Sequence, residues 1–325
     1  MTRPGAADPS PPALPVIDVA PLDGSDPAAR WQVAAQLRAA CENHGFFYIV
    51  GHGVDPALIR QVLAQSHTFF GQPAVRKARV DKALSPCNRG YEGLRNQTLQ
   101  TGAPPDVKEG YYIGVELPVD DARVLAGKFN HGPNLWPDNL PGFRHTMERY
   151  FAAMLALGRR LMRGMALSLA LPERYFDGFV DDAIATLRLL HYPPHPAQPM
   201  PGEKGCGEHT DFGSLTLLLQ DDVGGLQVMD AARGAWIDAP PVPGSYVVNI
   251  GDLIERWTNG RYHSTLHRVV NASGRERYSA PFFLSGAPDH VVACLPGCLA
   301  EGETARHPPI TVEQHLQQCY RRTYG

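Results

Sequence analysis

A histidine and an aspartate one residue apart are the first residues in this chain whose types and spacing suggest chemistry. They are His209 and Asp211, in a glycine-bounded segment that also contains Glu208. Alternate side chains of a β-strand share a face, so we expect His209 and Asp211 to point the same way and Glu208 to point oppositely. An imidazole beside a carboxylate offers two ligands for a divalent metal ion. A His-x-Asp pair is common by chance, so the prediction needs a third ligand.

His267 is the expected third ligand, and it lies 56 positions after Asp211 in a strand-like run over residues 264–270. Strand alternation puts Thr265, His267 and Val269 on one face. Two histidines and one carboxylate on a β scaffold are the ligand set of non-haem Fe(II) oxygenase sites. Such a set occupies one face of an octahedron and leaves the other positions open for a chelating cosubstrate and O₂.

The remaining histidines and cysteines are interpreted as structural or surface residues. Cys206 stands three positions before His209, but a thiolate softens a site that should favour iron, so we interpret it as a bystander. The six cysteines show neither zinc-finger spacing nor a disulfide framework, and we interpret them as reduced thiols. Four further histidines are expected to be structural or exposed: His191, His195, His263 and His307.

An arginine ten positions after His267 predicts an anchor for an acidic ligand. Strand alternation places Arg277 and Ser279 on one face. A guanidinium matches a carboxylate with two parallel hydrogen bonds, and a neighbouring hydroxyl can add another. A dicarboxylate that chelates iron at one end needs such an anchor at its other end. Arg275 suits a charged surface turn better, because the apolar strand begins directly after Arg277.

The elements that must position these residues begin with an N-terminal α/β region. Residues 14–19 read as a short strand and residues 46–50 as a buried strand. Apolar residues at helical spacing predict a helix over residues 27–43, which starts behind Asp26 as a cap. Asp55 and the proline after it predict the start of a second helix.

The middle of the chain reads first as loops and then as one long helix. Turn-forming residues dominate residues 83–140, and long irregular segments in enzymes tend to be functional. Residues 142–170 carry the longest helical pattern, which we interpret as a scaffold helix. Five side chains are candidates for a substrate pocket: Tyr91, Arg95, Tyr111, Tyr112 and Phe283.

From residue 184 the apolar residues no longer follow helical spacing but form short strand-like runs separated by turns. This pattern predicts a double-sheet jelly roll. The expected strands cover residues 184–192, 214–220, 226–229, 245–249, 265–270 and 278–284. A terminal helix is expected over residues 311–320, where it could pack over the barrel.

Composition and charge exclude several other kinds of protein. The 43% apolar and 19% charged residues are those of an ordinary globular chain with a sizeable core. A net charge of -3 draws it to neither nucleic acid nor anionic lipid. The sequence contains no apolar run long enough to span a bilayer and no apolar signal segment at its start, so we expect a cytoplasmic protein that acts on a small molecule. The oligomeric state is left open, and a monomer is compatible with the sequence.

The order and spacing of His209-x-Asp211, His267 and Arg277-x-Ser279 resemble the Fe(II)/2-oxoglutarate-dependent dioxygenase superfamily, and specifically its isopenicillin N synthase-like branch. The resemblance extends over nearly the whole chain, from residue 14 to residue 324. Further matching phrases are Leu14 to Asp18, Gly45 to Phe47, Asp106 to Glu109, Asn134 to Pro137 and Val248 to Asp252.

The resemblance implies a mainly β fold with flanking helices, in which a double-stranded β-helix (jelly roll) core follows the N-terminal α/β region. The expected divisions are a disordered leader (1–13), the N-terminal region with substrate-facing loops (14–140), scaffold helices (141–180), the dioxygenase core (181–295) and a C-terminal helical segment (296–325).

The resemblance also implies roles for individual residues. The implied iron ligands are His209, Asp211 and His267. Arg277 and Ser279 would bind the distal carboxylate of 2-oxoglutarate, and Tyr192 matches a family tyrosine that often contacts the cosubstrate. Leu190 is a departure, because many plant members carry asparagine two residues before that tyrosine.

The implied activity is oxidation of a small molecule with Fe(II), 2-oxoglutarate and O₂, which releases succinate and CO₂ and leads to hydroxylation, desaturation or ring closure. Three alternatives remain open. An isopenicillin N synthase-like oxidase would use the same fold without 2-oxoglutarate. A jelly-roll binding protein would have no turnover. A zinc hydrolase would need a general base over the metal, and Glu208 is expected on the wrong face.

Overall fold

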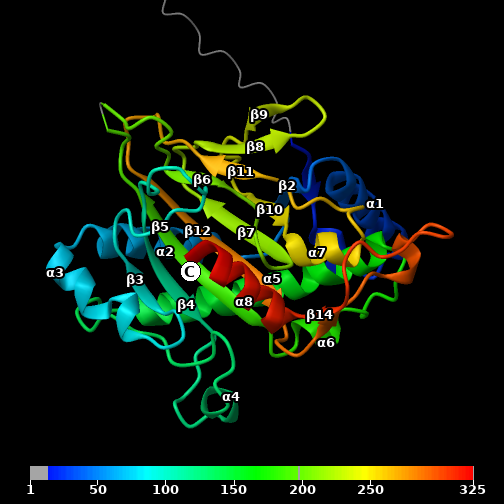
Figure 1. Cartoon of the computed structure of the whole chain (residues 1–325), viewed down its shortest axis with the longest axis horizontal. Helices are drawn as coiled ribbons and strands as arrows, with labels where there is room; N and C mark the ends of the chain where they lie inside the picture. The colour runs from blue at the N-terminus through cyan, green and yellow to red at the C-terminus, as the bar shows by residue number, and fades with distance from the viewer. Residues whose placement is uncertain (1–13, 197, 325) are drawn as a thin grey trace, which may run out of the picture.

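The computed structural model describes residues 14–196 and 198–324 (Figure 1). The expected leader over residues 1–13 lies outside the described residues. The strands are β1 Val16–Asp18, β2 Phe46–Val50, β3 Gly90–Glu92, β4 Glu109–Gly114, β5 Ile184–Tyr192, β6 Cys206–His209, β7 Leu215–Gln220, β8 Leu226–Asp230, β9 Ala235–Asp238, β10 Tyr246–Ile250, β11 His267–Val269, β12 Arg277–Gly286, β13 Val291–Val292 and β14 Ile310–Thr311. The α-helices are α1 Pro27–Asn43, α2 Pro56–Phe70, α3 Ala74–Lys77, α4 Ala122–Leu125, α5 Phe143–Ser168, α6 Asp177–Val180, α7 Asp252–Trp257 and α8 Val312–Tyr324. Short 3₁₀ helices are η1 Ala20–Asp23, η2 Ala78–Val80, η3 Lys82–Leu84 and η4 Pro296–Cys298.

The N-terminal helices begin where local chemistry predicts. The Asp26 side chain accepts a hydrogen bond from the backbone N–H of Ala28, and proline follows as the first residue of α1. Asp55 caps α2 in the same way through the N–H of Ala57. The prediction of two capped helices around the buried strand β2 is confirmed.

The largest element of the fold is an eight-stranded sheet in the order β1-β2-β10-β7-β12-β5-β4-β3. Its neighbours pair antiparallel, except for the parallel pair β1 and β2. The mainly β fold is therefore confirmed. Residues 83–140 were expected to be loop-rich, but they also contain β3, β4 and α4, and β4 pairs with β5 along its length. All six residues of β4 are buried, so the polar–apolar alternation of a half-exposed strand is missing.

A smaller sheet, in the order β6-β11-β8-β9, completes the jelly roll. A buried apolar cluster joins residues of β2, β5 and β10 in the large sheet to residues of β6, β8 and β11 in the small sheet. Side chains from both sheets therefore fill the space between them, and Figure 1 shows the small sheet lying beside the large one.

Helices cover the other face of the large sheet. The long helix α5 packs against α1, α2, β7 and β12, and its buried residues join the main apolar core. The expected scaffold helix is thus confirmed. The terminal helix α8 lies on a different side, near the strands that carry the candidate site (Figure 1). In the described part of the chain, the helices are too short or too polar to cross a membrane.

Candidate active site

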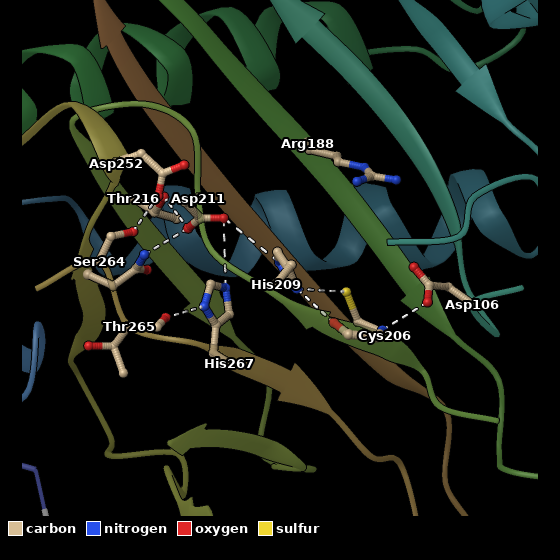
Figure 2. A network of polar contacts seen from close by, with 12 residues as sticks. Asp106, Arg188, Cys206, His209, Asp211, Thr216, Asp252, Ser264, Thr265 and His267 are labelled. Atoms are coloured by element: carbon tan, nitrogen blue, oxygen red, sulfur yellow. Dashed lines mark hydrogen bonds and ion pairs between the residues drawn. The ribbon is translucent and has the colours of Figure 1, made fainter. Parts of the chain in front are cut away.

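The three candidate metal ligands converge. His209, Asp211 and His267 each present one ligand atom, and these atoms lie within 4.8 Å of one another. Oδ1 of Asp211 is 3.8 Å from Nε2 of His209 and 3.7 Å from Nε2 of His267. Figure 2 shows the three side chains pointing toward a common centre. Two imidazoles and a carboxylate at this spacing can bind one divalent ion.

In both histidines the hydrogen bond of Nδ1 leaves Nε2 as the nitrogen that can bind a metal ion. Nδ1 of His209 is 2.7 Å from the carbonyl oxygen of Gly207, and Nδ1 of His267 is 3.1 Å from that of Thr265. Because a carbonyl can only accept, Nδ1 must carry the proton in both rings. Nε2 then keeps its lone pair, which is the tautomer a metal ligand needs.

Burial keeps both imidazoles neutral. It lowers the pKa of His209 and His267, and the neighbouring histidine lowers that of His267 further, although Asp211 acts in the opposite direction. Burial alone would raise the pKa of Asp211, but the two histidines and hydrogen bonds to its carboxylate outweigh burial and lower it. Neutral imidazoles beside an ionised carboxylate form the ligand set in its metal-binding protonation state.

Two hydrogen bonds orient the Asp211 carboxylate. Its Oδ2 accepts from Oγ1 of Thr216 at 2.6 Å and from Nδ2 of Asn249 at 2.7 Å, which leaves Oδ1 toward the histidines. Thr216 and Asn249 are neighbours across β7 and β10. The sequence analysis missed both residues as carboxylate partners. Strand pairing brings them together, and a single sequence does not show that pairing.

His209 and Asp211 do not share one strand face, although the sequence predicted that they would. Strand β6 ends at His209, so Asp211 lies in the following bend and not on the strand face. The backbone of that bend is held from α7, because the N–H of Asp252 donates to the carbonyl oxygen of Asp211 at 2.8 Å. Glu208 does face away, as expected, and pairs with Arg268 at 3.0 Å.

A cavity extends from the three candidate ligands to the predicted carboxylate anchor. We call it the Arg277 cavity. Its polar lining includes His209, Asp211, His267, Lys108, Tyr192, Arg277 and Ser279. Arg277 and Tyr192 are direct partners across β12 and β5, and the Arg277 guanidinium lies 4.8 Å from the Tyr192 ring centroid. The structure therefore brings all six site residues predicted from the sequence to one cavity.

The guanidinium of Arg277 is held by neutral groups. Nε donates to the carbonyl oxygen of Gly224 at 2.6 Å, Nη1 to Oγ of Ser279 at 3.2 Å and Nη2 to Oε1 of Gln220 at 3.3 Å. Arg277 is 1% exposed, and no carboxylate of the described residues 14–196 and 198–324 lies within 4.0 Å of it. A buried cation with only neutral partners is costly, so this arrangement favours an acidic ligand in the cavity.

Lys108 is a further buried cation in the same cavity, but its charge is balanced. Its Nζ is 2.5 Å from Oδ2 of Asp106 and 3.0 Å from Sγ of Cys206. The other oxygen of Asp106 accepts from the N–H of Gly207 at 2.8 Å (Figure 2). This pair secures β6 directly before His209. The sequence analysis noted Asp106 and Lys108 only as part of a family phrase.

A second cavity adjoins the first and shares His209, Asp211, Arg188, Leu99 and Phe283 with it. We call it the α8 cavity, because Leu316 and Tyr320 of that helix form part of its wall. Its other lining residues include Gln97, Leu99, Tyr112, Asn130, Ile184, Thr186, Arg188, Phe212, Phe283 and Ser285. Arg188 is 7% exposed and pairs with Glu92 at 2.7 Å.

The candidate pocket residues from the sequence divide into three groups. Tyr112 and Phe283 line the α8 cavity, and Phe283 also lines the Arg277 cavity. Tyr91 and Tyr111 instead belong to the core, where their hydroxyls donate to Glu109 and to the backbone of residue 135. Arg95 is on the outside, paired with Glu203.

Comparisons with known proteins identify the family to which this chain belongs. Residues 183–286 match the family described as the 2OG-Fe(II) oxygenase superfamily, and residues 14–139 match the N-terminal family described as non-haem dioxygenase in morphine synthesis. The chain belongs to the 2OG-Fe(II) oxygenase superfamily. It is therefore an enzyme that uses Fe(II), 2-oxoglutarate and O₂, as the resemblance in the sequence implied.

Relatives similar to this oxygenase cover it almost end to end. The 2-oxoglutarate-Fe(II) type oxidoreductase hxnY of Emericella nidulans is 46% identical over 97% of this chain and 92% of its own length. The 2-oxoglutarate-dependent dioxygenase citB of Monascus ruber is 40% identical, over 96% of each chain.

Solved structures show the same fold. The crystal structure of a full-length Neurospora crassa protein in complex with α-ketoglutarate (2-oxoglutarate) superimposes with a TM-score of 0.85 at 34% identity, over 96% of each chain. A second structure of that protein contains α-ketoglutarate and thymine, with a TM-score of 0.84 at 33% identity, over 96% of this chain and 97% of that one. These findings favour a 2-oxoglutarate-dependent oxygenase over the oxidase alternative, because the relatives are named for 2-oxoglutarate.

Proposed function

We propose that His209, Asp211 and His267 bind the ferrous ion of this oxygenase, and that Arg277 and Ser279 bind the distal carboxylate of 2-oxoglutarate. Support comes from the shared cavity, the Nε2 lone pairs that face Asp211, and the ionised state of the Asp211 carboxylate. Tyr192 contributes its ring beneath the guanidinium of Arg277.

One observation carries this proposal: the buried Arg277 has only neutral partners and lines the same cavity as the three ligands. A ferrous ion, Asp211, Arg277 and a 2-oxoglutarate dianion together have no net charge. Two other buried cations, Lys108 and Arg188, already pair with a carboxylate: Lys108 with Asp106, and Arg188 with Glu92, which also pairs with Lys82. A dicarboxylate thus neutralises the cation that the protein leaves uncompensated.

Bound iron with 2-oxoglutarate and O₂ supplies the oxidant that removes hydrogen from a substrate C–H bond. The residues of this chain position the two reactants. Thr216 and Asn249 hold the Asp211 carboxylate, and the carbonyls of Gly207 and Thr265 hold the imidazole rings. Arg277 and Asp211 are themselves buried, which shields the charged groups at the two ends of the cosubstrate from water.

The α8 cavity is the proposed substrate site, because it reaches His209 and Asp211 from another direction. Tyr112, Phe212, Phe283 and Tyr320 give it aromatic walls, and Arg188 gives it a buried donor. Aromatic walls with a buried cationic donor suit a small planar ring that carries a carbonyl or carboxylate group. The thymine bound to the similar Neurospora crassa protein is a ring of this kind.

We propose that the enzyme works in the cytoplasm on a free small molecule and does not act on nucleic acid. All six cysteines are free thiols, which suits a reducing compartment. The net charge of -3 provides no attraction for a polyanion.

The experiment is an anaerobic titration of the protein with Fe(II) and 2-oxoglutarate, followed by turnover with a panel of small carbonyl-bearing rings. We expect a metal-to-ligand charge-transfer band in the anaerobic complex and, after O₂ is admitted, succinate in equal amount to oxidised substrate. Oxygen consumption without succinate would contradict the proposed role of Arg277. A charge-transfer band of unchanged strength in Asp211→Ala would contradict the proposed iron ligands.

A further inference from the structure

A second group of metal-ligating side chains lies outside the site described above. Asp252 begins α7, while His315 and Cys319 are four residues apart on α8 and therefore share one face of that helix. One ligand atom from each of the three lies within 4.8 Å of the other two. The group joins two helices that are more than fifty residues apart in the sequence.

The spacing of the sulfur and nitrogen donors fits a tetrahedral metal ion. Sγ of Cys319 is 3.6 Å from Nε2 of His315. Bonds of about 2.3 Å to sulfur and about 2.0 Å to nitrogen, at a tetrahedral angle, put these two donors about 3.5 Å apart. His315 is 9% exposed and Cys319 is 5% exposed, so the donors are shielded from competing water.

The surrounding groups orient the donors. Oγ of Ser264 donates to Oδ1 of Asp252 at 2.7 Å (Figure 2), which fixes the carboxylate. The Nε2–H of His315 donates to the carbonyl oxygen of Phe212 at 3.1 Å, so Nε2 can bind a metal only in the tautomer that carries the proton on Nδ1. Burial lowers the pKa of His315 and so favours the neutral ring that a metal requires.

The donor types distinguish this group from the iron site. His209, Asp211 and His267 offer nitrogen and oxygen, whereas Cys319 adds a sulfur. A thiolate with imidazole and carboxylate favours zinc, while the sulfur-free set suits ferrous iron. Metal binding replaces the S–H bond of Cys319 by an S–metal bond and releases the proton to water.

We propose that Asp252, His315 and Cys319 form a second metal site that takes Zn²⁺ and fastens α8 over the substrate cavity. Both attachment points lie beside the iron ligands: the N–H of Asp252 donates to Asp211, and His315 contacts the backbone of Phe212. Leu316, next to His315, lines the α8 cavity. Zinc at this position connects the helix that covers the substrate to the bend that carries Asp211.

The test uses Co²⁺ as a spectroscopic substitute for zinc, titrated anaerobically into the full-length metal-free protein. We expect two cobalt ions per chain, one of which shows a near-ultraviolet sulfur-to-cobalt charge-transfer band. Cys319→Ser should remove the band and lower the stoichiometry to one. His315→Gln is a second variant in case Cys319→Ser folds poorly, and it should also lose the second ion.

Cys206→Ser is the matched control, because Cys206 is a buried cysteine whose sulfur is 3.9 Å from Nδ1 of His209. It should keep the band and both ions. His267→Ala should lose the sulfur-free ion and keep the band, which separates this site from the proposed iron site. A single cobalt ion without the band in the wild type, or a band that survives Cys319→Ser, would overturn the proposal.

Discussion

The Arg277 cavity and the α8 cavity share part of their lining, including His209, Asp211 and Arg188, but are built differently. Most of the Arg277 cavity is lined by side chains of paired strands, from β2, β5 to β8 and β10 to β12. The α8 cavity takes part of its wall from loops around residues 97–99 and 130, from the bend at residues 210–213 and from α8. Strands hold most of the proposed metal ligands and the proposed carboxylate anchor in place, whereas loops and a terminal helix shape the proposed substrate site. Four substitutions test whether the two cavities have these separate tasks.

The largest effect is expected for Asp211→Ala, because Asp211 lines both cavities. Loss of a direct ligand should weaken Fe(II) binding by more than the roughly 100-fold that loss of an outer partner can cost, and turnover should stop. Fe(II) titration and succinate release measure the two effects. Glu208→Ala is the control, since Glu208 faces the other side and pairs with Arg268. Equal losses in both variants would show that the effect is not specific to the proposed ligand.

Arg277→Ala should affect the cosubstrate alone. Removing a buried cation that binds a carboxylate should cost about 3 kcal/mol, or about 100-fold in the dissociation constant of 2-oxoglutarate. Equilibrium binding of 2-oxoglutarate to the Fe(II) enzyme measures this. Arg275→Ala is the control: Arg275 is exposed and pairs with Asp222. If Arg275→Ala weakened binding as much as Arg277→Ala, the anchor would be assigned to the wrong arginine.

Arg188→Gln should affect the substrate more than the cosubstrate, because Arg188 lines both cavities but its guanidinium contacts Gln97 and Tyr112, which line only the α8 cavity. Loss of a charged hydrogen bond to the substrate should raise its KM about tenfold. Arg188 also pairs with Glu92, so circular dichroism should first establish that the variant is folded. A tenfold weaker binding of 2-oxoglutarate with an unchanged substrate KM would reverse the assignment of the two cavities.

Thr216→Val should have the smallest effect. It removes one hydrogen bond to Oδ2 of Asp211, while the bond from Asn249 remains. Iron affinity should fall about tenfold, at the lower end of the effects seen for outer partners of metal ligands. Competition with a metal chelator measures the affinity. An unchanged affinity would mean that Asn249 alone orients the carboxylate.

The features that could be predicted from the sequence are those set by local residue patterns and spacing. Caps such as Asp26 are local signals, and strand β5 was expected over the residues that it occupies. The convergence of His209, Asp211 and His267 and the position of Arg277 were expected from spacing, although the bend that carries Asp211 was mistaken for a strand. Their roles, and the division of the chain into five regions, stay predictions.

The missed features depend on contacts between distant segments. Strand β4 is buried on both faces and carries no alternation. The six-residue helix α7 was not expected. Leu316 and Tyr320 reach the α8 cavity only because α8 packs back against the core, and no spacing rule connects them to His209.

The central claim is that one ferrous ion is shared by His209, Asp211 and His267, with 2-oxoglutarate between it and Arg277. The most direct measurement is an anomalous difference map at the iron edge, from crystals of the protein grown anaerobically with Fe(II) and 2-oxoglutarate. We predict an iron peak within bonding distance of Nε2 of both histidines and Oδ1 of Asp211, with one 2-oxoglutarate carboxylate against the guanidinium of Arg277. Iron bound away from these three atoms, or 2-oxoglutarate that does not contact Arg277, would contradict the claim.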